Sequence, residues 1–195
     1  MENKIKIVLG TNNEHKLAEI NEISKDYDIE FILPGNNFSP IENGENFEQN
    51  SYIKASEASR LTNCISLADD SGLCVEALNG EPGIYSARYD DTPQKRINKL
   101  LKNLANSTNR RAKFVCDMTL VDESGNILNH EVGECHGKIS QIQSGINGFG
   151  YDPIFIPDGY NITMAEMSED LKNSISHRSV ALQKMLDYIK NSLMI

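Results

Sequence analysis

The opening of the chain alternates between two apolar runs and an amphipathic stretch, and this order leaves few possible folds. Residues 5–9 (IKIVL) predict a strand, residues 14–24 predict a helix, and residues 30–33 (EFIL) predict a second strand that Pro34 ends. A strand–helix–strand unit of this kind is typical of parallel or mixed sheets covered by helices. We therefore predict an α/β fold.

The rest of the chain continues this pattern without a repeat, a low-complexity tract or an obvious linker. We expect helices at 46–62, from Thr92-Pro93 to about residue 104 and from about residue 176 onward, and strands at 64–68, 112–121 and 127–140. Residues 122–126 (DESGN) predict a hairpin between the last two strands. A chain of 195 residues can bury one core, so we predict a single domain over residues 1–195.

Charge and cysteine content argue against several classes of function. The 19 basic and 28 acidic residues leave a net charge of −9, which argues against a partner such as nucleic acid or an acidic membrane surface. A small anionic ligand held by a few local cations remains compatible with this charge. The four cysteines show no CxxC spacing, and no apolar run has the length of a signal or membrane-spanning segment, so we expect a cytoplasmic protein with reduced thiols.

Two adjacent carboxylates, Asp69 and Asp70, follow the apolar run 64–68 and lead directly into Ser71-Gly72. Because like charges repel each other, a fold gains nothing by placing them at the end of a buried strand unless a cation faces them. Hard divalent metals prefer carboxylate oxygens, which favours a metal site that also contacts a substrate. The alternative is a solvated turn, since Asp, Ser and Gly are all common in turns.

The predicted helix at 46–62 carries one lysine within an otherwise uncharged stripe. Phe47, Ser51, Lys54, Ala58 and Leu61 follow one another at helical spacing. Two interpretations are open: Lys54 extends its stem over apolar surface toward water, or it projects a cation inward to meet an anion.

Three further segments have the composition of ligand-binding loops. Residues 10–16 (GTNNEHK) join a strand to a helix N-terminus, where backbone N–H groups favour a phosphate, although an ordinary capped helix has the same pattern. Residues 148–153 (GFGYDP) place an aromatic ring between glycines, which suits either stacking on a nucleobase or a turn held by core aromatics. Residues 172–178 (KNSISHR) bring cations to the positive end of the last helix, where they need an anion or acceptor opposite them; a surface arginine and a satisfied histidine are the alternative.

In this order, the segments resemble the inosine triphosphate pyrophosphatase family, which hydrolyses non-canonical purine nucleoside triphosphates. The matching pieces are TNNEHK (11–16), ENGENFEQNSYIKA (42–55), LADDSGLCVEALNGEPGIYSARY (67–89), GFGYDPIF (148–155) and SISHR (174–178). The resemblance implies an elongated mixed sheet flanked by helices, in two lobes with a central nucleotide cleft, and a homodimer. It also implies Mg²⁺-dependent cleavage of ITP, dITP and XTP between the α- and β-phosphates, which releases pyrophosphate and a nucleoside monophosphate and cleanses the nucleotide pool.

The resemblance also implies roles for individual residues. Asp70 matches the general base and, with Glu42, the metal ligands, while Asp69 matches a supporting carboxylate. The implied phosphate contacts are Thr11, Asn12, Asn13, Glu14, His15, Lys16, Lys54 and Ser71. The implied nucleoside contacts are Phe149, Gly150, Tyr151, Asp152, Lys172, His177 and Arg178. As a catalytic residue, Lys54 would compensate the charge that grows on the departing pyrophosphate.

The chain departs from the family's pattern at four uncharged positions. Asn12 and Asn147 stand where glycine is common, Asn43 lies inside the turn that resembles Glu-Thr-Gly, and Ser51 stands where alanine usually follows asparagine. None of these is a charged catalytic position, so we expect the activity to persist with an altered phosphate loop.

Two other functions stay open at this point: a nucleotide pyrophosphatase with a different base preference, and a nucleotide-sensing module without catalysis. A keto group at position 6 of a purine accepts a hydrogen bond where adenine donates one, so donors from His177 or Arg178 would favour hypoxanthine and xanthine. The sequence does not indicate how guanine is rejected. It also assigns no role to His130, His136 or Arg88.

Overall fold

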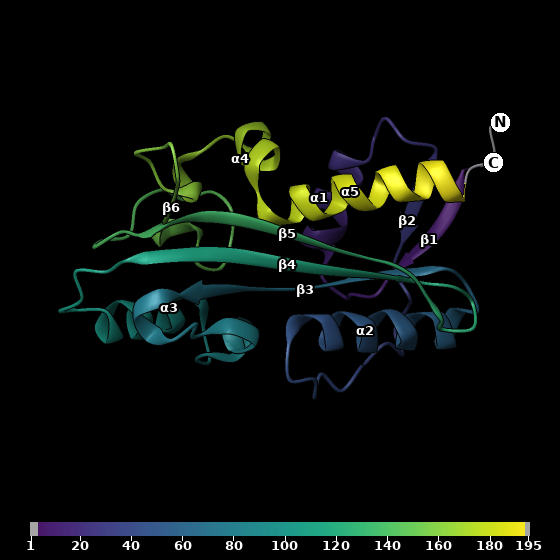
Figure 1. Ribbon diagram of the computed structural model, residues 1–195, viewed down its shortest axis with the longest axis horizontal. Helices are drawn as coiled ribbons and strands as arrows, with labels where there is room; N and C mark the ends of the chain where they lie inside the picture. The colour runs from purple at the N-terminus through teal and green to yellow at the C-terminus, as the bar shows by residue number, and fades with distance from the viewer. Residues whose placement is uncertain (1–3, 194–195) are drawn as a thin grey trace. The chain divides into compact units, whose positions relative to one another are not determined.

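The computed structural model describes residues 4–193, and within them six strands form one mixed sheet in the order β2-β1-β3-β4-β5-β6 (Figure 1). The strands are β1 (Ile5–Leu9), β2 (Ile29–Ile32), β3 (Ser66–Val75), β4 (Arg111–Val121), β5 (Ile127–Ile139) and β6 (Phe155–Pro157). Strand β1 pairs in parallel with β2 and β3, whereas β5 and β6 are antiparallel. The α/β fold with a mixed sheet is therefore confirmed.

Three of the helices begin and end within two residues of their predicted bounds, and the last helix begins one residue after its predicted start. The helices are α1 (Glu14–Ile23), α2 (Phe47–Thr62), α3 (Pro93–Asn103), α4 (Glu169–Ile175) and α5 (His177–Ser192). Polar caps account for the accurate starts: the side chains of Asn13, Asn46 and Thr92 accept backbone N–H groups of the first turn in α1, α2 and α3. Helix α4 and strand β6 were not predicted, because seven and three residues are too few to show a period.

The prediction of a strand over residues 64–68, with Asp69 and Asp70 at its end, is wrong. Strand β3 begins at Ser66 and continues through both aspartates to Val75. It pairs with β1 at Ser66 and Leu67 and with β4 on its other edge, and Ser71 and Gly72 belong to this extended strand despite their preference for turns. The two carboxylates thus lie in the middle of a central strand.

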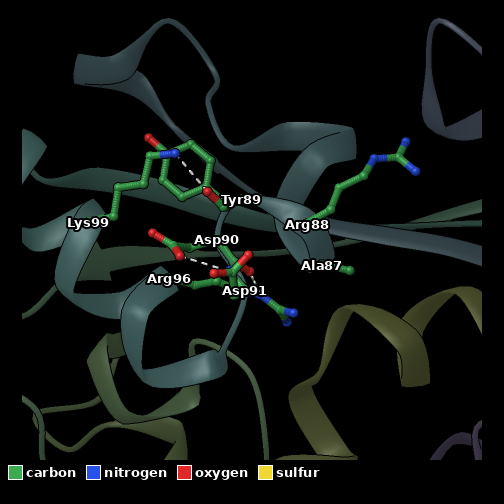
Figure 2. A pocket seen from close by; sticks show the side chains of 7 residues that line it. All are labelled: Ala87, Arg88, Tyr89, Asp90, Asp91, Arg96 and Lys99. Atoms are coloured by element: carbon green, nitrogen blue, oxygen red, sulfur yellow. Dashed lines mark hydrogen bonds between the residues drawn. The ribbon is translucent and has the colours of Figure 1, made fainter.

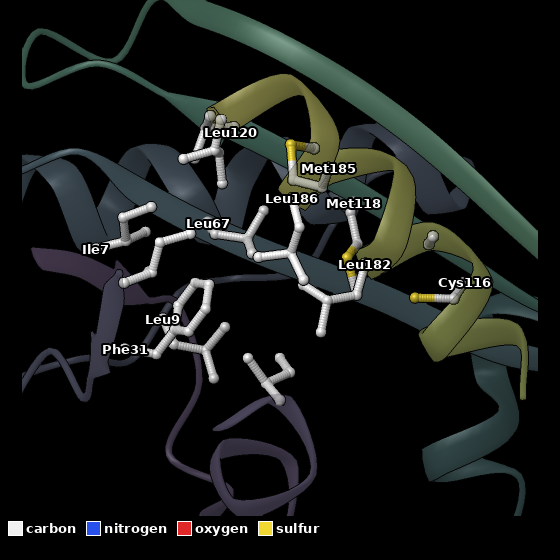
Figure 3. Close-up of a cluster of buried hydrophobic side chains, with 14 residues drawn as sticks. Ile7, Leu9, Phe31, Leu67, Cys116, Met118, Leu120, Leu182, Met185 and Leu186 are labelled. Atoms are coloured by element: carbon white, nitrogen blue, oxygen red, sulfur yellow. The ribbon is translucent and has the colours of Figure 1, made fainter. Parts of the chain in front are cut away.

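Contacts along the chain define two units. The first comprises residues 1–70, 116–133 and 178–195, and the second comprises residues 71–115 and 134–177. The first unit buries a cluster in which Leu182, Met185 and Leu186 of α5 pack against strand residues such as Leu9 and Met118 (Figure 3). In the second unit, residues of α3 and β3 pack with Tyr151, Phe155 and their neighbours.

Helix α2 covers the other face of the first unit's sheet, where alternate residues point away from α5. Its buried face is made of small residues, among them Ala55 and Ala58, which let the helix lie close to the strands. A Cβ atom placed on Gly10 would lie 2.9 Å from both the Lys54 carbonyl oxygen and the Ala68 Cβ. Glycine at this position therefore permits the close approach of α2.

Within residues 4–193, no helix combines the length and the apolar character that crossing a membrane requires.

Candidate active site

Asp69 and Asp70 contact different partners because successive side chains of a strand point to opposite faces of the sheet. Asp69 accepts hydrogen bonds from Lys16 of α1 and Arg178 of α5. Asp70 is bonded to Lys54 of α2 on the other face. The adjacent carboxylates therefore do not share one cation in the structure, and each is neutralised by its own.

The charged group on the α2 face has three members, which are Lys54, Asp70 and Glu42. The Lys54 ammonium lies 2.8 Å from Asp70 Oδ1 and 3.2 Å from Glu42 Oε2. Burial opposes the charge on Lys54, but the carboxylates of Asp70, Asp69 and Glu42 outweigh it and raise the pKa of the ammonium. Burial also raises the pKa of Asp70, more than its bonds to Lys54 and Asn50 lower it. Lys54 thus stays cationic, while Asp70 is a stronger proton acceptor than an ordinary carboxylate.

Asn50 is a site residue to which the sequence reasoning gave no role. Its amide nitrogen donates to Asp70 Oδ2 at 3.2 Å, and its amide oxygen accepts the Gly44 N–H at 2.9 Å. The second bond fixes the orientation of the amide, so that the nitrogen faces the carboxylate. The spacing of Asn50 and Lys54, four residues apart on α2, places both on one helix face and was the available signal.

On the α5 face, a fully buried arginine neutralises two carboxylates. Arg178 is 2% exposed, and its guanidinium donates to Glu19 at 2.7 Å and to Asp69 at 3.2 Å. Burial disfavours its charge, but Asp69 and Glu19 more than compensate and raise its pKa. Lys16 lies 2.9 Å from Asp69. Lys16 and Arg178, which were both predicted to contact substrate, are therefore both bonded to Asp69, and their substrate contacts stay predictions.

The turn before α1 uses much of its hydrogen-bonding capacity internally. Asn13 Oδ1 accepts the N–H groups of His15 and Lys16, and Thr11 Oγ1 accepts the N–H of Asn13. Asn12 donates to the Phe38 carbonyl at 2.8 Å. This pattern is that of a capped helix, one of the two interpretations of the segment, and a phosphate would compete with Asn13 for the same N–H groups.

The residues present fit a magnesium ion that is shared with a substrate. Within residues 4–193, no cluster of three or more His, Cys, Asp or Glu side chains has the arrangement of a protein-only metal site. Glu42 and Asp70, however, direct one carboxylate oxygen each at the same ammonium. One or two carboxylates, completed by water and phosphate oxygens, are the ligands that Mg²⁺ takes in nucleotide-processing sites.

The second unit assembles the glycine-rich turn around one carboxylate. Asp152 Oδ2 accepts the Phe149 N–H at 2.8 Å and lies 2.7 Å from the Lys172 ammonium. A Cβ atom on Gly148, whose φ is +71°, would lie 2.1 Å from the same oxygen, so only glycine fits there. The Phe149 ring is 44% exposed, with the Lys172 ammonium 4.6 Å from its centroid. The predicted stacking residue is thus accessible.

Three other predicted nucleoside and phosphate contacts differ in accessibility. The His177 ring stacks on Phe114 with centroids 4.8 Å apart and is buried. Tyr151 belongs to the core, where its hydroxyl donates to the Ser86 carbonyl and burial raises its pKa. Ser71 follows Asp70 on β3 and is half-buried. Tyr151 therefore acts first as a packing residue.

A separate cavity of about 570 Å³ lies in the second unit and contains none of the predicted site residues (Figure 2). It is lined by Ala87, Arg88, Tyr89, Asp90, Asp91, Arg96 and Lys99. Arg96 and Lys99 of α3 donate to the backbone carbonyls of Asp90 and Tyr89. These bonds attach α3 to the preceding segment, which is a structural role.

Known proteins resemble this chain over most of its length. The sequence model of the Ham1 family matches residues 7–188. The chain belongs to the Ham1 family. It is 41% identical to a dITP/XTP pyrophosphatase of Aquifex aeolicus, over 96% of this chain and 98% of the relative. It is 42% identical to a dITP/XTP pyrophosphatase of Nostoc sp., over 92% of each. The family expected from the sequence motifs is thereby confirmed.

Solved structures of the Ham1 family agree with the fold. A HAM1 protein from Coxiella burnetii superposes with a TM-score of 0.89 at 38% identity, covering 96% of this chain and 100% of that structure. A nucleoside-triphosphatase / dITP/XTP pyrophosphatase from Mycobacterium abscessus superposes with a TM-score of 0.76 at 36% identity, covering 93% and 99%.

The Ham1 chain also buries a second carboxylate on the α2 face, which the sequence reasoning missed. Asp117 of β4 accepts a hydrogen bond from Ser51 of α2 at 3.0 Å and lies 2.6 Å from His130 Nε2. Burial raises the pKa of Asp117, outweighing the bonds from His130 and Ser51 that lower it. Residues 117 and 119 lie on the same face of β4, the face toward α2. The alternation of side chains along β4 was therefore the signal that could have identified this group.

The raised pKa of Asp117 predicts how Asp117→Asn changes stability with pH. A carboxyl whose pKa is higher in the folded than in the unfolded state stabilises the fold below the unfolded value, about 4, and loses this contribution as pH rises through the folded value. We therefore expect the melting temperature of Asp117→Asn, relative to that of the parent, to increase as the pH is raised from about 3.5 to about 5.5. This pH range lies below the ordinary pKa of histidine. Calorimetry across this range measures it. A relative decrease would show that the fold lowers the pKa of Asp117.

Proposed function

We propose that this chain is a Mg²⁺-dependent pyrophosphatase acting on dITP, XTP and ITP, which cleaves between the α- and β-phosphates. The observation that carries the proposal is the group formed by the buried Asp70 and Lys54 with the half-buried Glu42. It combines a carboxylate that accepts protons readily, a permanent cation and a second carboxylate on the same ammonium. The names of the relatives, dITP/XTP pyrophosphatases, support the same reaction.

In this mechanism the protein supplies a base, a counter-charge and orientation. Bound Mg²⁺ supplies neutralisation of phosphate charge and a more acidic water. Asp70 accepts a proton from the attacking water, and Asn50 holds the carboxylate in place through its second oxygen. Lys54 carries the positive charge that offsets the negative charge growing on the leaving pyrophosphate.

Base selection is proposed for the second unit. Phe149 offers an exposed ring for stacking, which is worth about 1–3 kcal/mol per base. Lys172 lies beside that ring and supplies N–H donors that suit a keto oxygen and disfavour the amino group of adenine. His177 and Arg178 remain proposed nucleoside contacts on the family resemblance.

Three further proposals concern the protein as a whole. The family resemblance supports a homodimer and a single domain of two lobes over residues 1–195, and the pattern of the cysteines supports a cytoplasmic location. The net charge of −9 supports the absence of a nucleic-acid partner.

A substrate panel tests the proposed reaction. ITP, dITP, XTP, GTP, dTTP and UTP are each incubated with the protein with Mg²⁺ or with EDTA, and pyrophosphate and orthophosphate are measured separately. We expect pyrophosphate from ITP, dITP and XTP, with Mg²⁺ only. Preference for a pyrimidine would indicate a different pyrophosphatase, and tight ITP binding without product would indicate a sensing module.

Asp70→Asn removes the proposed base and keeps its shape. We expect kcat for ITP to fall at least about 10²-fold, the smallest contribution typical of general base catalysis. Asp187→Asn, which changes an exposed carboxylate of α5 in the same unit, is the matched control and should keep the parental kcat. Circular dichroism confirms folding of both variants. Parental turnover by Asp70→Asn would remove Asp70 from the mechanism.

Two substitutions separate charge from packing at Lys54. Lys54→Met keeps an apolar stem without the ammonium, and Lys54→Ala removes both. If the charge binds phosphate, KM for the triphosphate should rise about tenfold or more in both variants, the loss of one charge-assisted hydrogen bond. If the lysine serves packing, Lys54→Met should keep the parental KM and only Lys54→Ala should lose stability.

A further inference from the structure

A buried chain of hydrogen bonds joins α2 to strand β4. Ser51 Oγ lies 2.7 Å from Thr119 Oγ1 and 3.0 Å from Asp117 Oδ1, and His130 Nε2 lies 2.6 Å from the same carboxylate oxygen. Ser51, Asp117 and Thr119 are all buried, whereas the His130 side chain is 31% exposed. None of these residues belongs to the group proposed for catalysis.

The direction of each bond follows from the number of protons available. An ionised carboxylate only accepts, and Ser51 has a single hydroxyl hydrogen. The Ser51 hydrogen faces two acceptors, Asp117 Oδ1 at 3.0 Å and the Glu48 carbonyl oxygen at 2.9 Å, and this leaves Thr119 as the donor to Ser51. His130 donates to Asp117 from the opposite end. The contact between α2 and β4 is therefore made of directional hydrogen bonds.

Directional contacts matter on α2 because its buried alanines give the helix little orientation. Ala55 and Ala58 pack by van der Waals contact, which tolerates small rotations of a helix better than a hydrogen bond does. Ser51 is next to Asn50 and three residues before Lys54. A rotation of α2 that lengthened the Ser51 bonds would also move Asn50 and Lys54 relative to Asp70.

We propose that Ser51 is a positioning residue of the active site: its bonds to Asp117 and Thr119 hold α2 in the rotation at which Asn50 and Lys54 meet Asp70. The catalytic meaning of this role rests on the proposed function, whereas the positioning itself does not. Ser51 is no nucleophile, because it is fully buried and its hydroxyl lies between the Asp117 carboxylate and the Glu48 carbonyl, with His130 on the far side of that carboxylate.

Helix α2 offers a matched pair of variants. Ser51→Ala removes the hydroxyl that faces β4, one turn from Lys54. Ser59→Ala removes another fully buried hydroxyl of the same helix, which donates to the Asp122 carbonyl at 2.7 Å. Ser51→Ala loses the bonds to Asp117 and Thr119 of β4, and Ser59→Ala loses the bond to Asp122, the residue that follows β4. A purely structural role predicts a loss of stability with parental activity in both variants.

The first measurement is kinetic. We expect Ser51→Ala to lower kcat for ITP about tenfold or more with a smaller change in KM, since small misplacements of catalytic groups act mainly on the transition state. Ser59→Ala should keep the parental kcat. Equal kcat values in the two variants would overturn the proposal. If Ser51→Ala does not fold, Thr119→Val, which removes the donor to Ser51, takes its place and should lower kcat in the same sense.

The second measurement needs no substrate. The side-chain NH₂ signals of Asn50 in the ¹H–¹⁵N spectrum of the ligand-free protein report its bond to Asp70, and their loss in Asn50→Asp identifies them. These signals should shift in Thr119→Val, whose altered side chain is not adjacent to Asn50 in sequence, and stay in place in Ser59→Ala. Unchanged signals in Thr119→Val would overturn the positioning role. If the parent releases no pyrophosphate from any nucleotide, the proposed function fails while this measurement still decides the positioning.

Discussion

The ion pair between Lys54 and Asp70 is the interaction on which the candidate active site depends. A buried ammonium is costly unless carboxylates and hydrogen bonds replace its water, and Lys54 has Asp70 at 2.8 Å and Glu42 at 3.2 Å. The distance requires α2 to lie close to β3, which the small residues of the helix and the absence of a side chain at Gly10 allow. The packing of alanine and glycine in this region is thus a condition of the chemistry.

The alternation of β3 separates two charges that are neighbours in sequence. Asp70 faces α2, where burial raises its pKa and leaves it a good proton acceptor. Asp69 faces α1 and α5, where Lys16 and Arg178 neutralise it. Two carboxylates of the same type therefore have different properties because of the cations that each face of the sheet supplies. This division gives a carboxyl with a raised pKa on one face and, on the other, two carboxylates paired with two cations.

Local patterns of the sequence were enough to predict most elements. The period and the polar caps identify α1, α2 and α3, because both signals lie within a few residues of each helix. The spacing on α2 left Lys54 open between an outward and an inward orientation, and the structure shows the inward one. The metal-binding roles of Glu42 and Asp70 stay predictions from the family resemblance. The continuation of β3 was not predictable, because the pairing with β4 that extends it involves residues at least 36 positions away.

The remaining features of the site depend on contacts that no local pattern contains. Asn50 has a defined role only because the Gly44 N–H orients its amide. The bond between Ser51 and Asp117 joins residues 66 positions apart, and the sequence shows Ser51 only as a departure from the usual alanine. Arg178 could be identified as a cation at a helix start, but its burial between Glu19 and Asp69 requires the tertiary structure.

The pair of aspartates in β3 also has a consequence for folding accuracy. A shift of β3 by one residue against its neighbours would exchange the two faces of the strand. Asp70 would then turn toward the arginine side and Asp69 toward the lysine helix, while Leu67 and Ala68 would exchange environments of different volume. The apolar residues would then meet the wrong neighbours, and one of the two cation sites would lose its carboxylate, so the slipped pairing is disfavoured on both counts.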